Sequence, residues 1–267
     1  MKKKTGKFNL ILGCILLGGI GLFALSGLLF MPYDPEGMDI ANKLAAPSLA
    51  HPFGCDNFGR DIFSRVQSGL LTTLGIGISS VALGTVLGTL LGALMGYYAG
   101  LIDEGLMRIM DVLFAIPSIL LALIFLSVFD SSMGNVILAL GFSIVPSFAK
   151  MMRQEFRKQR EMEYVKVAKL FGASDARILF VHILPNVMPT FINCILISFN
   201  NAVLAEAGMS YLGIGVQPPK ASLGRMLSEA QGYLTSAPFY TIFPGIIMIL
   251  MLFGFCLLSE KGSEKNA

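Results

Sequence analysis

Six long stretches without a charged residue alternate with polar segments along the chain. They are residues 8–33, 66–102, 112–129, 131–149, 178–205 and 230–259. Each holds about twenty apolar residues, the length of helix that crosses a hydrocarbon core roughly 30 Å thick. Backbone groups in lipid must bond within the protein, and these stretches lack the alternation of a barrel strand. The pattern therefore predicts an all-α membrane protein with six transmembrane helices.

The same pattern divides the chain into successive parts. Residues 1–30 form a cytoplasmic N-terminus and the first helix, and residues 31–68 form an extracytoplasmic segment. Residues 69–258 form a core of five helices that contains a polar cytoplasmic loop, residues 150–185, and residues 259–267 form a cytoplasmic tail. The first apolar run is longer than that of a secretory signal and no clean cleavage site follows, so we interpret it as a retained anchor.

Positive charge is distributed unevenly between the two sides of the predicted membrane. With the N-terminus inside, fifteen Lys and Arg residues fall in cytoplasmic segments. The remaining five are Lys43, Arg60, Arg65, Lys220 and Arg225. Because Lys and Arg favour cytoplasmic loops, both termini are predicted to lie in the cytoplasm, with the protein in the cell membrane.

The composition excludes some classes of function. The chain is 54% hydrophobic and 14% charged, with a mean hydropathy of +0.71, whereas a soluble domain has about 25% charged residues. Its net charge of +3 is too small for binding a phosphate backbone, so nucleic acid is not an expected partner.

Cysteine chemistry contributes little. Cys55 is the one cysteine of four that falls outside the predicted spans, and it lies near His51 and Asp56. These residues do not make a convincing set of metal ligands, so no metal site is predicted.

Glycines recur at every fourth position of the second span, at Gly84, Gly88, Gly92 and Gly96, and again at Gly100. On a helix they form one stripe of small residues, which allows another helix to approach closely. We interpret the stripe as a helix-packing surface.

A few polar residues lie inside the fifth span. Glu206, with Asn200 and Asn201, is the best candidate for lining a polar translocation path. Hydrogen bonding between helices is the competing interpretation.

The cytoplasmic loop has the strongest pattern outside the membrane. Residues 150–177 contain eight basic and four acidic residues, with apolar residues at three-and-four spacing. The apolar positions are Tyr164, Val167, Ala168 and Phe171. This spacing predicts an amphipathic helix whose apolar stripe anchors the loop.

A second short helix is predicted to follow. Gly172 ends the first helix, Ser174 caps the next one, Asp175 lies in its first turn, and Pro185 closes the unit before the fifth span. An amphipathic helix lying on anionic lipid is the alternative, but it does not require two helices joined by a bend at a glycine. We therefore favour a docking surface for a soluble protein.

At these residues the chain resembles the permease subunits of ATP-binding-cassette (ABC) importers. Their cytoplasmic loop has a Glu-Ala-Ala, Gly and Ile-x-Leu-Pro frame. Here Lys166-Val167-Ala168, Gly172 and His182-Ile183-Leu184-Pro185 occupy that frame. The chain is most similar to the second (C-type) permease of the branch that imports dipeptides, oligopeptides and nickel, a binding-protein-dependent inner-membrane component. Motifs that carry this similarity are His51-Pro52-x-Gly54-x-Asp56-x-x-Gly59-Arg60-Asp61, Glu163-Tyr164-Val165, Gly172-Ala173-Ser174 and Leu204-Ala205-Glu206-Ala207-Gly208 through Gly213-x-Gly215-Val216-Gln217-Pro218-Pro219.

The chain departs from the family pattern at several places. Lys166 and Val167 replace a Glu-Ala pair, which reverses a charge on the docking helix. Leu223 replaces a frequent Trp, and the chain lacks the Gly-Asp-x-Leu-Arg-Asp segment that commonly follows the last span.

The resemblance implies a type I ABC importer permease fold and a defined set of partners. These are a homologous second permease, two ABC ATPase subunits, an extracytoplasmic solute-binding protein and membrane lipid. The chain has no phosphate-binding Gly-x-x-x-x-Gly-Lys-Ser/Thr motif. It is therefore not expected to be an enzyme or to carry a cofactor, and ATP and Mg²⁺ would bind to the partner ATPase.

The ATPase-coupling residues are then expected between 163 and 185. They are Glu163, Tyr164, Val167, Ala168, Phe171, Gly172, Ser174, Asp175 and Pro185. Di- and oligopeptides are the first expectation for the cargo, and nickel or a metal chelate is the second. A secondary carrier and a structural membrane protein are the alternatives from other classes.

Overall fold

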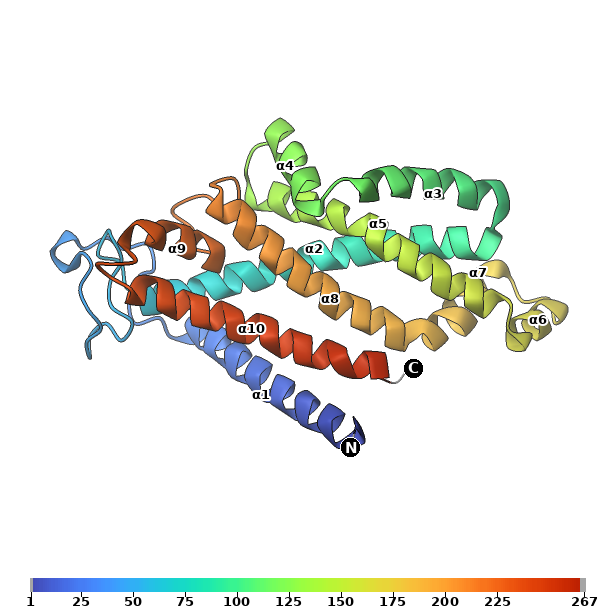
Figure 1. The fold of residues 1–267 in the computed structure, drawn as a ribbon, viewed down its shortest axis with the longest axis horizontal. Coiled ribbons are helices and arrows are strands. Elements are labelled where there is room, and N and C mark those ends of the chain that lie inside the picture. The colour runs from blue at the N-terminus through green and yellow to red at the C-terminus, as the bar shows by residue number, and fades with distance from the viewer. Residues whose placement is uncertain (1, 265–267) are drawn as a thin grey trace.

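The computed structural model describes residues 2–264, and this part of the chain is all-α. Long helices run side by side along the longest axis of the molecule (Figure 1). They are α1 (Lys2–Leu29), α2 (Ile62–Tyr98), α5 (Met133–Arg160), α8 (Leu184–Tyr211) and α10 (Phe239–Glu264). Within residues 2–264, five helices are long and apolar enough to cross a membrane, and the number is six when a sharply bent helix pair is counted as one span. The prediction of six spans is confirmed on this count.

The third predicted span, residues 112–129, is not one straight helix. The chain forms α3 (Gly100–Ala115) and α4 (Ser118–Val128), which are bent by 90° relative to each other. Pro117 causes the break because its ring disfavours a helical conformation at the preceding residue. Ile116 accordingly has an extended backbone, with φ −89° and ψ 126°.

Other predicted span boundaries are corrected as well. The sixth span was expected to begin at residue 230, but α10 begins at Phe239. The fourth span was expected over residues 131–149, but α5 continues to Arg160, with Met152 and Phe156 buried in the extension. The fifth was expected to begin at residue 178, but helical structure runs from Asp175 to Tyr211. It comprises α7 (Asp175–Arg177), a π-helical segment η2 (Ile178–Ile183) and α8.

Helices α2 and α5 pack along the glycine stripe. A Cβ at Gly84, Gly88, Gly92 or Gly96 would approach α5 atoms to between 2.5 and 2.8 Å. Such a distance is shorter than van der Waals contact, so only glycine allows this separation of the two helices. Gly100 lies outside the stripe because it begins α3 with a φ of +64°.

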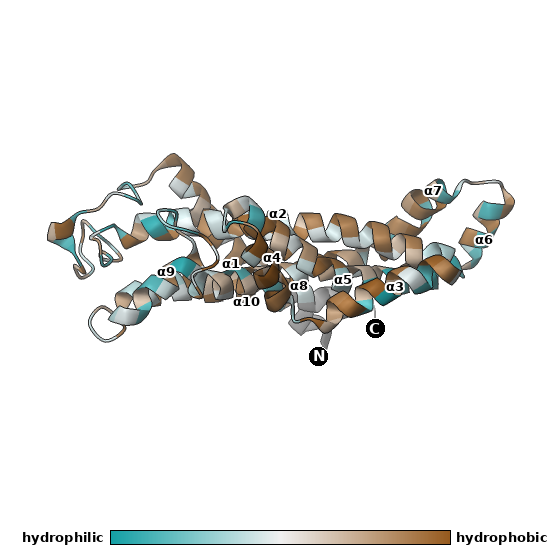
Figure 2. Cartoon of the chain, turned by 90° about the horizontal axis from the view of Figure 1, so that it is seen from above, coloured by the Kyte–Doolittle hydropathy of each residue, from teal (hydrophilic) through white to brown (hydrophobic). Residues whose placement is uncertain are grey.

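The two ends of the bundle differ in structure. At one end, residues 30–61, which we call the cap segment, are irregular apart from η1 (Ile40–Asn42), and they lie near α9 (Leu223–Ala230) and η3 (Gln231–Tyr233). At the other end lies α6 (Glu163–Leu170), and α1 begins and α10 ends on the side of the bundle toward it (Figure 1). Hydrophilic residues gather on α9 and on α6, at opposite ends (Figure 2).

The cap segment leads directly into the second span. Helix α2 begins at Ile62, inside the segment that was expected to be extracytoplasmic (residues 31–68), and the Asp61 carboxylate caps it by accepting a hydrogen bond from the Ser64 amide at 2.8 Å. The predicted tail, residues 259–267, is also helical as far as Glu264, and residues 265–267 lie outside the described part of the chain.

Candidate functional site

Residues 161–183, which we call the coupling unit, connect α5 to α8 at the end of the bundle opposite the cap segment (Figure 1). The unit consists of α6, a bend at Gly172, α7 and η2. Glu163 lies in the first turn of α6, where its negative charge interacts favourably with the positive end of the helix dipole.

The bend at Gly172 is built from backbone hydrogen bonds. Gly172 has a φ of +78°, and its N–H donates to the Lys169 carbonyl at 2.9 Å. The Ala173 N–H donates to the Ala168 carbonyl at 3.0 Å. These two bonds form a Schellman motif, which ends a helix most readily at glycine. The prediction that Gly172 ends the helix is thus realised in the geometry.

The second helix begins where the sequence indicated. The Ser174 hydroxyl accepts a bond from the Arg177 amide at 3.4 Å, and Asp175 is the first residue of α7. The Asp175 carboxylate also contacts the end of α2, where the Tyr97 hydroxyl donates to Oδ1 at 2.5 Å. Sequence reasoning missed Tyr97. Its one local signal is a pair of tyrosines at the end of an apolar span, which is also a common feature of membrane interfaces.

The apolar stripe of α6 does not anchor the coupling unit. Tyr164 is 36% exposed, Val167 is 49% exposed and Phe171 is 87% exposed. The anchor is Val165, which is fully buried in the hydrophobic core, and half-buried Ala168 packs against the same core. Val167 and Phe171 therefore point outward, and so does Leu170, which sequence reasoning missed and which is 86% exposed.

The exposed stripe forms one wall of a groove of about 530 Å³. The groove is lined by Tyr164, Val167, Ala168, Phe171, Gly172, Ala173, Arg177 and His182. Burial raises the pKa of the Tyr164 phenol, whose hydroxyl donates to Gln159 Oε1 at 2.8 Å. The groove brings five predicted coupling residues together and adds a cation, Arg177.

Pro185 does not close the coupling unit. It is the second residue of α8, inside continuous helical structure. The π-helical segment before it is wider than an α-helix, and the Leu184 N–H bonds to the Leu179 carbonyl five residues back. In an α-helix the ring of a proline clashes with the carbonyl group four residues earlier. The wider π turn moves that carbonyl aside, so it accommodates Pro185.

A polar groove runs between α5, α8 and α10 on the same half of the molecule. Its volume is about 840 Å³, and a smaller cavity of about 130 Å³ shares Met151, Cys194 and Ile197 with it. The polar residues that line the groove and the smaller cavity are Glu155, Lys158, Gln159, Asn186, Thr190, Asn193, Ser259, Ser147, Ser198 and Asn201. On α8, the positions 186, 190, 193, 197 and 201 recur at helical spacing and share one face.

The three residues expected to line a translocation path have different surroundings in the structure. Asn201 lines the smaller cavity, and half-buried Asn200 has its Oδ1 buried without a hydrogen-bond partner in the described residues. Glu206 is only 1% exposed, and its Oε1 accepts bonds from the hydroxyls of Ser210 at 2.6 Å and Ser222 at 2.8 Å. Glu206 therefore links α8 to the residue that caps the start of α9.

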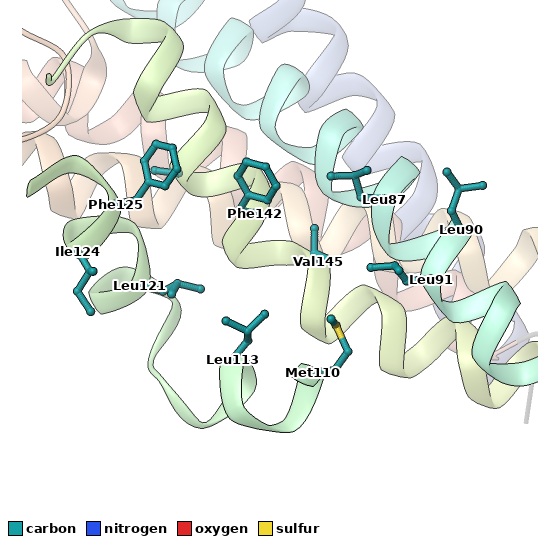
Figure 3. Close-up of a pocket in the computed structure, with 11 residues that line it drawn as sticks. Leu87, Leu90, Leu91, Met110, Leu113, Leu121, Ile124, Phe125, Phe142 and Val145 are labelled. Atoms are coloured by element: carbon teal, nitrogen blue, oxygen red, sulfur yellow. The ribbon is translucent and has the colours of Figure 1, made fainter. Parts of the chain in front are cut away.

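Another cavity, of about 540 Å³, lies between α2, α3, α4 and α5 (Figure 3). Every side chain that lines it is apolar, including Met110, Phe125 and Phe142. Such a lining offers no hydrogen bond to a polar solute, so this cavity is not the candidate path.

Among the side chains that the structure describes, no three from His, Cys, Asp or Glu come together as metal ligands. Cys55 is fully buried in the cap segment, and its backbone N–H donates to the Ala45 carbonyl at 2.9 Å. His51 Nδ1 lies 2.9 Å from the Asp61 carboxylate.

Comparisons with known proteins assign a family. Residues 88–260 match the family described as binding-protein-dependent transport system inner membrane component. The chain is 40% identical over 231 residues to the glutathione transport system permease protein GsiD of Pectobacterium atrosepticum, with 86% of this chain and 77% of that protein covered. It is also 40% identical over 230 residues to GsiD of Escherichia coli O157:H7, with 86% and 76% covered.

Solved structures share the fold. The chain is similar to a chain of the inward-facing MetNI methionine ABC transporter, with a TM-score of 0.60, 18% identity and coverage of 74% of this chain and 94% of that one. It is also similar to an amino acid ABC transporter crystallised with histidines, with a TM-score of 0.56, 18% identity and coverage of 76% and 94%. The chain therefore belongs to the family of binding-protein-dependent transport system inner-membrane components, the multi-pass permease subunits of ABC importers.

Proposed function

We propose that the coupling unit receives mechanical work from two ABC ATPase subunits, which bind ATP and Mg²⁺ and carry out the hydrolysis. The observation that carries this proposal is the exposed apolar stripe of α6 beside the Gly172 bend. Leu170 and Phe171 are both more than four-fifths exposed. Burial of a side chain of this size in a partner stabilises a complex by about 2 kcal/mol.

The apolar groove fits a docking contact that depends little on charge. Lys166 and Val167, which replace the Glu-Ala pair of related permeases, lie on α6, and Val167 lines the groove. The contact would therefore rest on Val167, Phe171 and the groove behind them, with Arg177 as its charged member.

The permease would form half of a translocation path, and a homologous second permease would supply the other half. The polar groove of α5 and α8 supports this role because amide and hydroxyl groups line a face of a membrane helix. Asn201 and Asn200 stay in the proposed path. Glu206 would contribute only if its enclosure by Ser210 and Ser222 opens during transport.

Di- and oligopeptides are the proposed cargo, delivered by an extracytoplasmic solute-binding protein. The relatives named as glutathione transport permeases support a peptide. The groove supports it as well, since Glu155 and Lys158 place one charge of each sign beside several amides, which suits a zwitterion. Import of nickel or a metal chelate by the same kind of complex is the alternative, and ligand retention by the purified binding protein distinguishes the two.

The proposed orientation places the coupling unit and both termini in the cytoplasm, with the cap segment and α9 outside. The excess of Lys and Arg near the coupling unit supports it. Single cysteines at Leu49 and at Leu170, labelled in intact cells with a membrane-impermeant maleimide, provide the test. Labelling at Leu49 alone supports the orientation, and labelling at Leu170 alone overturns it.

Co-purification tests the docking proposal. Leu170→Asp and Phe171→Asp place a charge in the apolar contact and should reduce recovery of the ATPase with the permease at least tenfold, about 1.4 kcal/mol. Leu49→Asp is the matched control because Leu49 is fully exposed at the opposite end of the bundle. Equal ATPase recovery with all three variants would contradict the proposal, and uptake that needs no ATP would instead favour a secondary carrier.

A further inference from the structure

We propose that the hydrogen bond between Tyr97 and Asp175 transmits movement of the coupling unit to α2, and through α2 to the cap end of the bundle. Tyr97 is a positioning residue in this scheme and contacts no cargo. The inference rests on the proposed function, because the movement comes from the ATPase.

The contact is close and partly buried. Tyr97 is 4% exposed, and its hydroxyl donates to Asp175 Oδ1 at 2.5 Å. A hydrogen bond to a carboxylate is roughly twice as strong as one between neutral groups. The neighbouring Tyr98 is 45% exposed, and its hydroxyl lies 3.4 Å from Oδ2 of the same carboxylate.

Tyr97 contacts both arms of the bend. Asp175 follows Gly172 and begins the helical stretch that ends at Tyr211. Lys169 precedes Gly172 on α6, and its Nζ lies 4.7 Å from the centre of the Tyr97 ring. A change of angle at Gly172 would therefore move at least one of the two groups that hold the Tyr97 side chain.

Helix α2 is suited to carry such a displacement. Its 37 residues span about 55 Å at 1.5 Å per residue. The glycine stripe fixes it against α5 over several turns near Tyr97. At the other end of α2, Arg65 donates a hydrogen bond to Glu229 of α9 at 3.0 Å. A movement of α2 would therefore reach α9 at the cap end through this contact.

The test uses the complete importer, with this chain, the second permease and both ATPases in lipid vesicles, and the binding protein loaded with its cargo. ATP hydrolysis and uptake are measured on the same vesicles. Tyr97→Phe keeps the aromatic ring and removes only the hydroxyl. We expect the cargo imported per ATP hydrolysed to fall at least about fivefold, the lower range of coupling between distant sites, while the ATPases stay bound.

Two further variants separate coupling from folding. Tyr98→Phe makes the same chemical change at the adjacent position. Its cargo imported per ATP should stay within about twofold of wild type, because the Tyr98 hydroxyl is exposed to water and its bond to Asp175, at 3.4 Å, is much longer than that of Tyr97. Asp175→Asn weakens the same bond from the other side, so it decides the question even if Tyr97→Phe does not assemble. Combining Tyr97→Phe with Asp175→Asn should give no larger loss than either change alone.

A readout at the cap end distinguishes transmission from local damage. A cysteine at Leu49, a fully exposed residue of the cap segment, reports the exposure of that segment through its rate of maleimide labelling. Addition of ATP and vanadate should change this rate in the wild-type complex and leave it unchanged in Tyr97→Phe.

The outcomes are distinct. A wild-type complex that neither binds ATPases nor imports cargo contradicts the proposed function itself. A functional wild-type complex with unchanged cargo per ATP in both Tyr97→Phe and Asp175→Asn overturns the transmission role. Loss of ATPase binding in both variants also overturns it, because the contact would then only shape the docking surface.

Discussion

Arg65 of α2 and Glu229 of α9 lie 164 positions apart in the sequence, and their side chains form an ion pair at 3.0 Å. The same carboxylate oxygen of Glu229 also accepts bonds from Arg60 at 3.1 Å and from the Tyr240 hydroxyl at 3.2 Å. Asp56 completes the group because its Oδ2 accepts from Arg60 Nε at 2.6 Å. This network joins the cap segment, α2, α9 and α10 into one assembly.

Glu229→Gln should destabilise the cap end. It removes a negative charge from two arginines that are nearly fully buried, and breaking a buried ion pair costs about 3–5 kcal/mol. We expect a lower thermal midpoint by circular dichroism and faster trypsin cleavage at Arg60. Glu36→Gln, at an exposed glutamate of the same segment, is the control and should match the wild type. Equal midpoints for all three proteins would show that the network does not hold the cap.

Gly92→Ala should weaken the contact between α2 and α5. The added Cβ would lie 2.6 Å from Met152 Cβ and 2.7 Å from the Ala149 carbonyl oxygen. Overpacking of this kind costs about 1–3 kcal/mol, which should appear as a lower thermal midpoint in detergent. Gly105→Ala in α3 is the control because its Cβ would meet no atom within 4 Å. A Gly92→Ala midpoint as high as that of Gly105→Ala would contradict the packing argument.

Gly172→Val should abolish ATP-driven uptake while membrane insertion stays intact. Space around Gly172 is open, so the change acts through the φ of +78°, a conformation that costs an L-residue about 1–2 kcal/mol. Asparagine tolerates this conformation better than valine does, so Gly172→Asn should retain more uptake. Uptake by Gly172→Val at the wild-type rate would count strongly against the bend as a functional element.

The Cys55 thiol should react slowly with alkylating reagents in the folded protein. Burial, and then the negative charges of Asp61, Asp56 and Asp39, raise its pKa from 9.0 to about 11. At pH 8 the thiolate fraction then falls from about one in ten to about one in a thousand. Iodoacetamide labelling of Cys55 in membranes should keep rising with pH through about 11. A labelling rate that levels off near pH 9 would show that the folded chain leaves this pKa unchanged.

The raised pKa of Cys55 also affects stability. The unfolded chain loses this proton near pH 9, whereas the folded chain retains it until about pH 11. The contribution of the Cys55 thiol to the free energy of unfolding is therefore fully present below pH 9 and is lost as the pH rises from 9 to 11.

The membrane architecture could be predicted from the sequence because lipid imposes a local rule. A helix in hydrocarbon must be apolar over its own length, so runs such as residues 66–102 identify a span without reference to other segments. The position of the bend in the coupling unit also depends only on residues close to it in the sequence. Gly172 and Ser174 end and begin helices through bonds within six residues, so their roles follow from residue type and spacing.

Residues whose surroundings come from other helices could not be placed in this way. The pattern of Tyr164, Val167 and Phe171 predicts an apolar face but does not say whether that face is buried or exposed. Pro117 marks a break, yet the 90° angle between α3 and α4 depends on the helices against which they pack.

Contacts between distant segments were decided by the tertiary structure alone. Tyr97 meets Asp175 across 78 positions, and Arg65 meets Glu229 across 164. Glu206 and Asn201 lie on one helix, but one is enclosed by Ser210 and Ser222 while the other lines a cavity. The sequence by itself determined which segments enter the membrane and where the chain bends, because those depend on each residue and its near neighbours. Only the packing of α2, α8, α9 and α10 decided which charges and hydroxyls meet, because that depends on the positions of helices remote in the sequence.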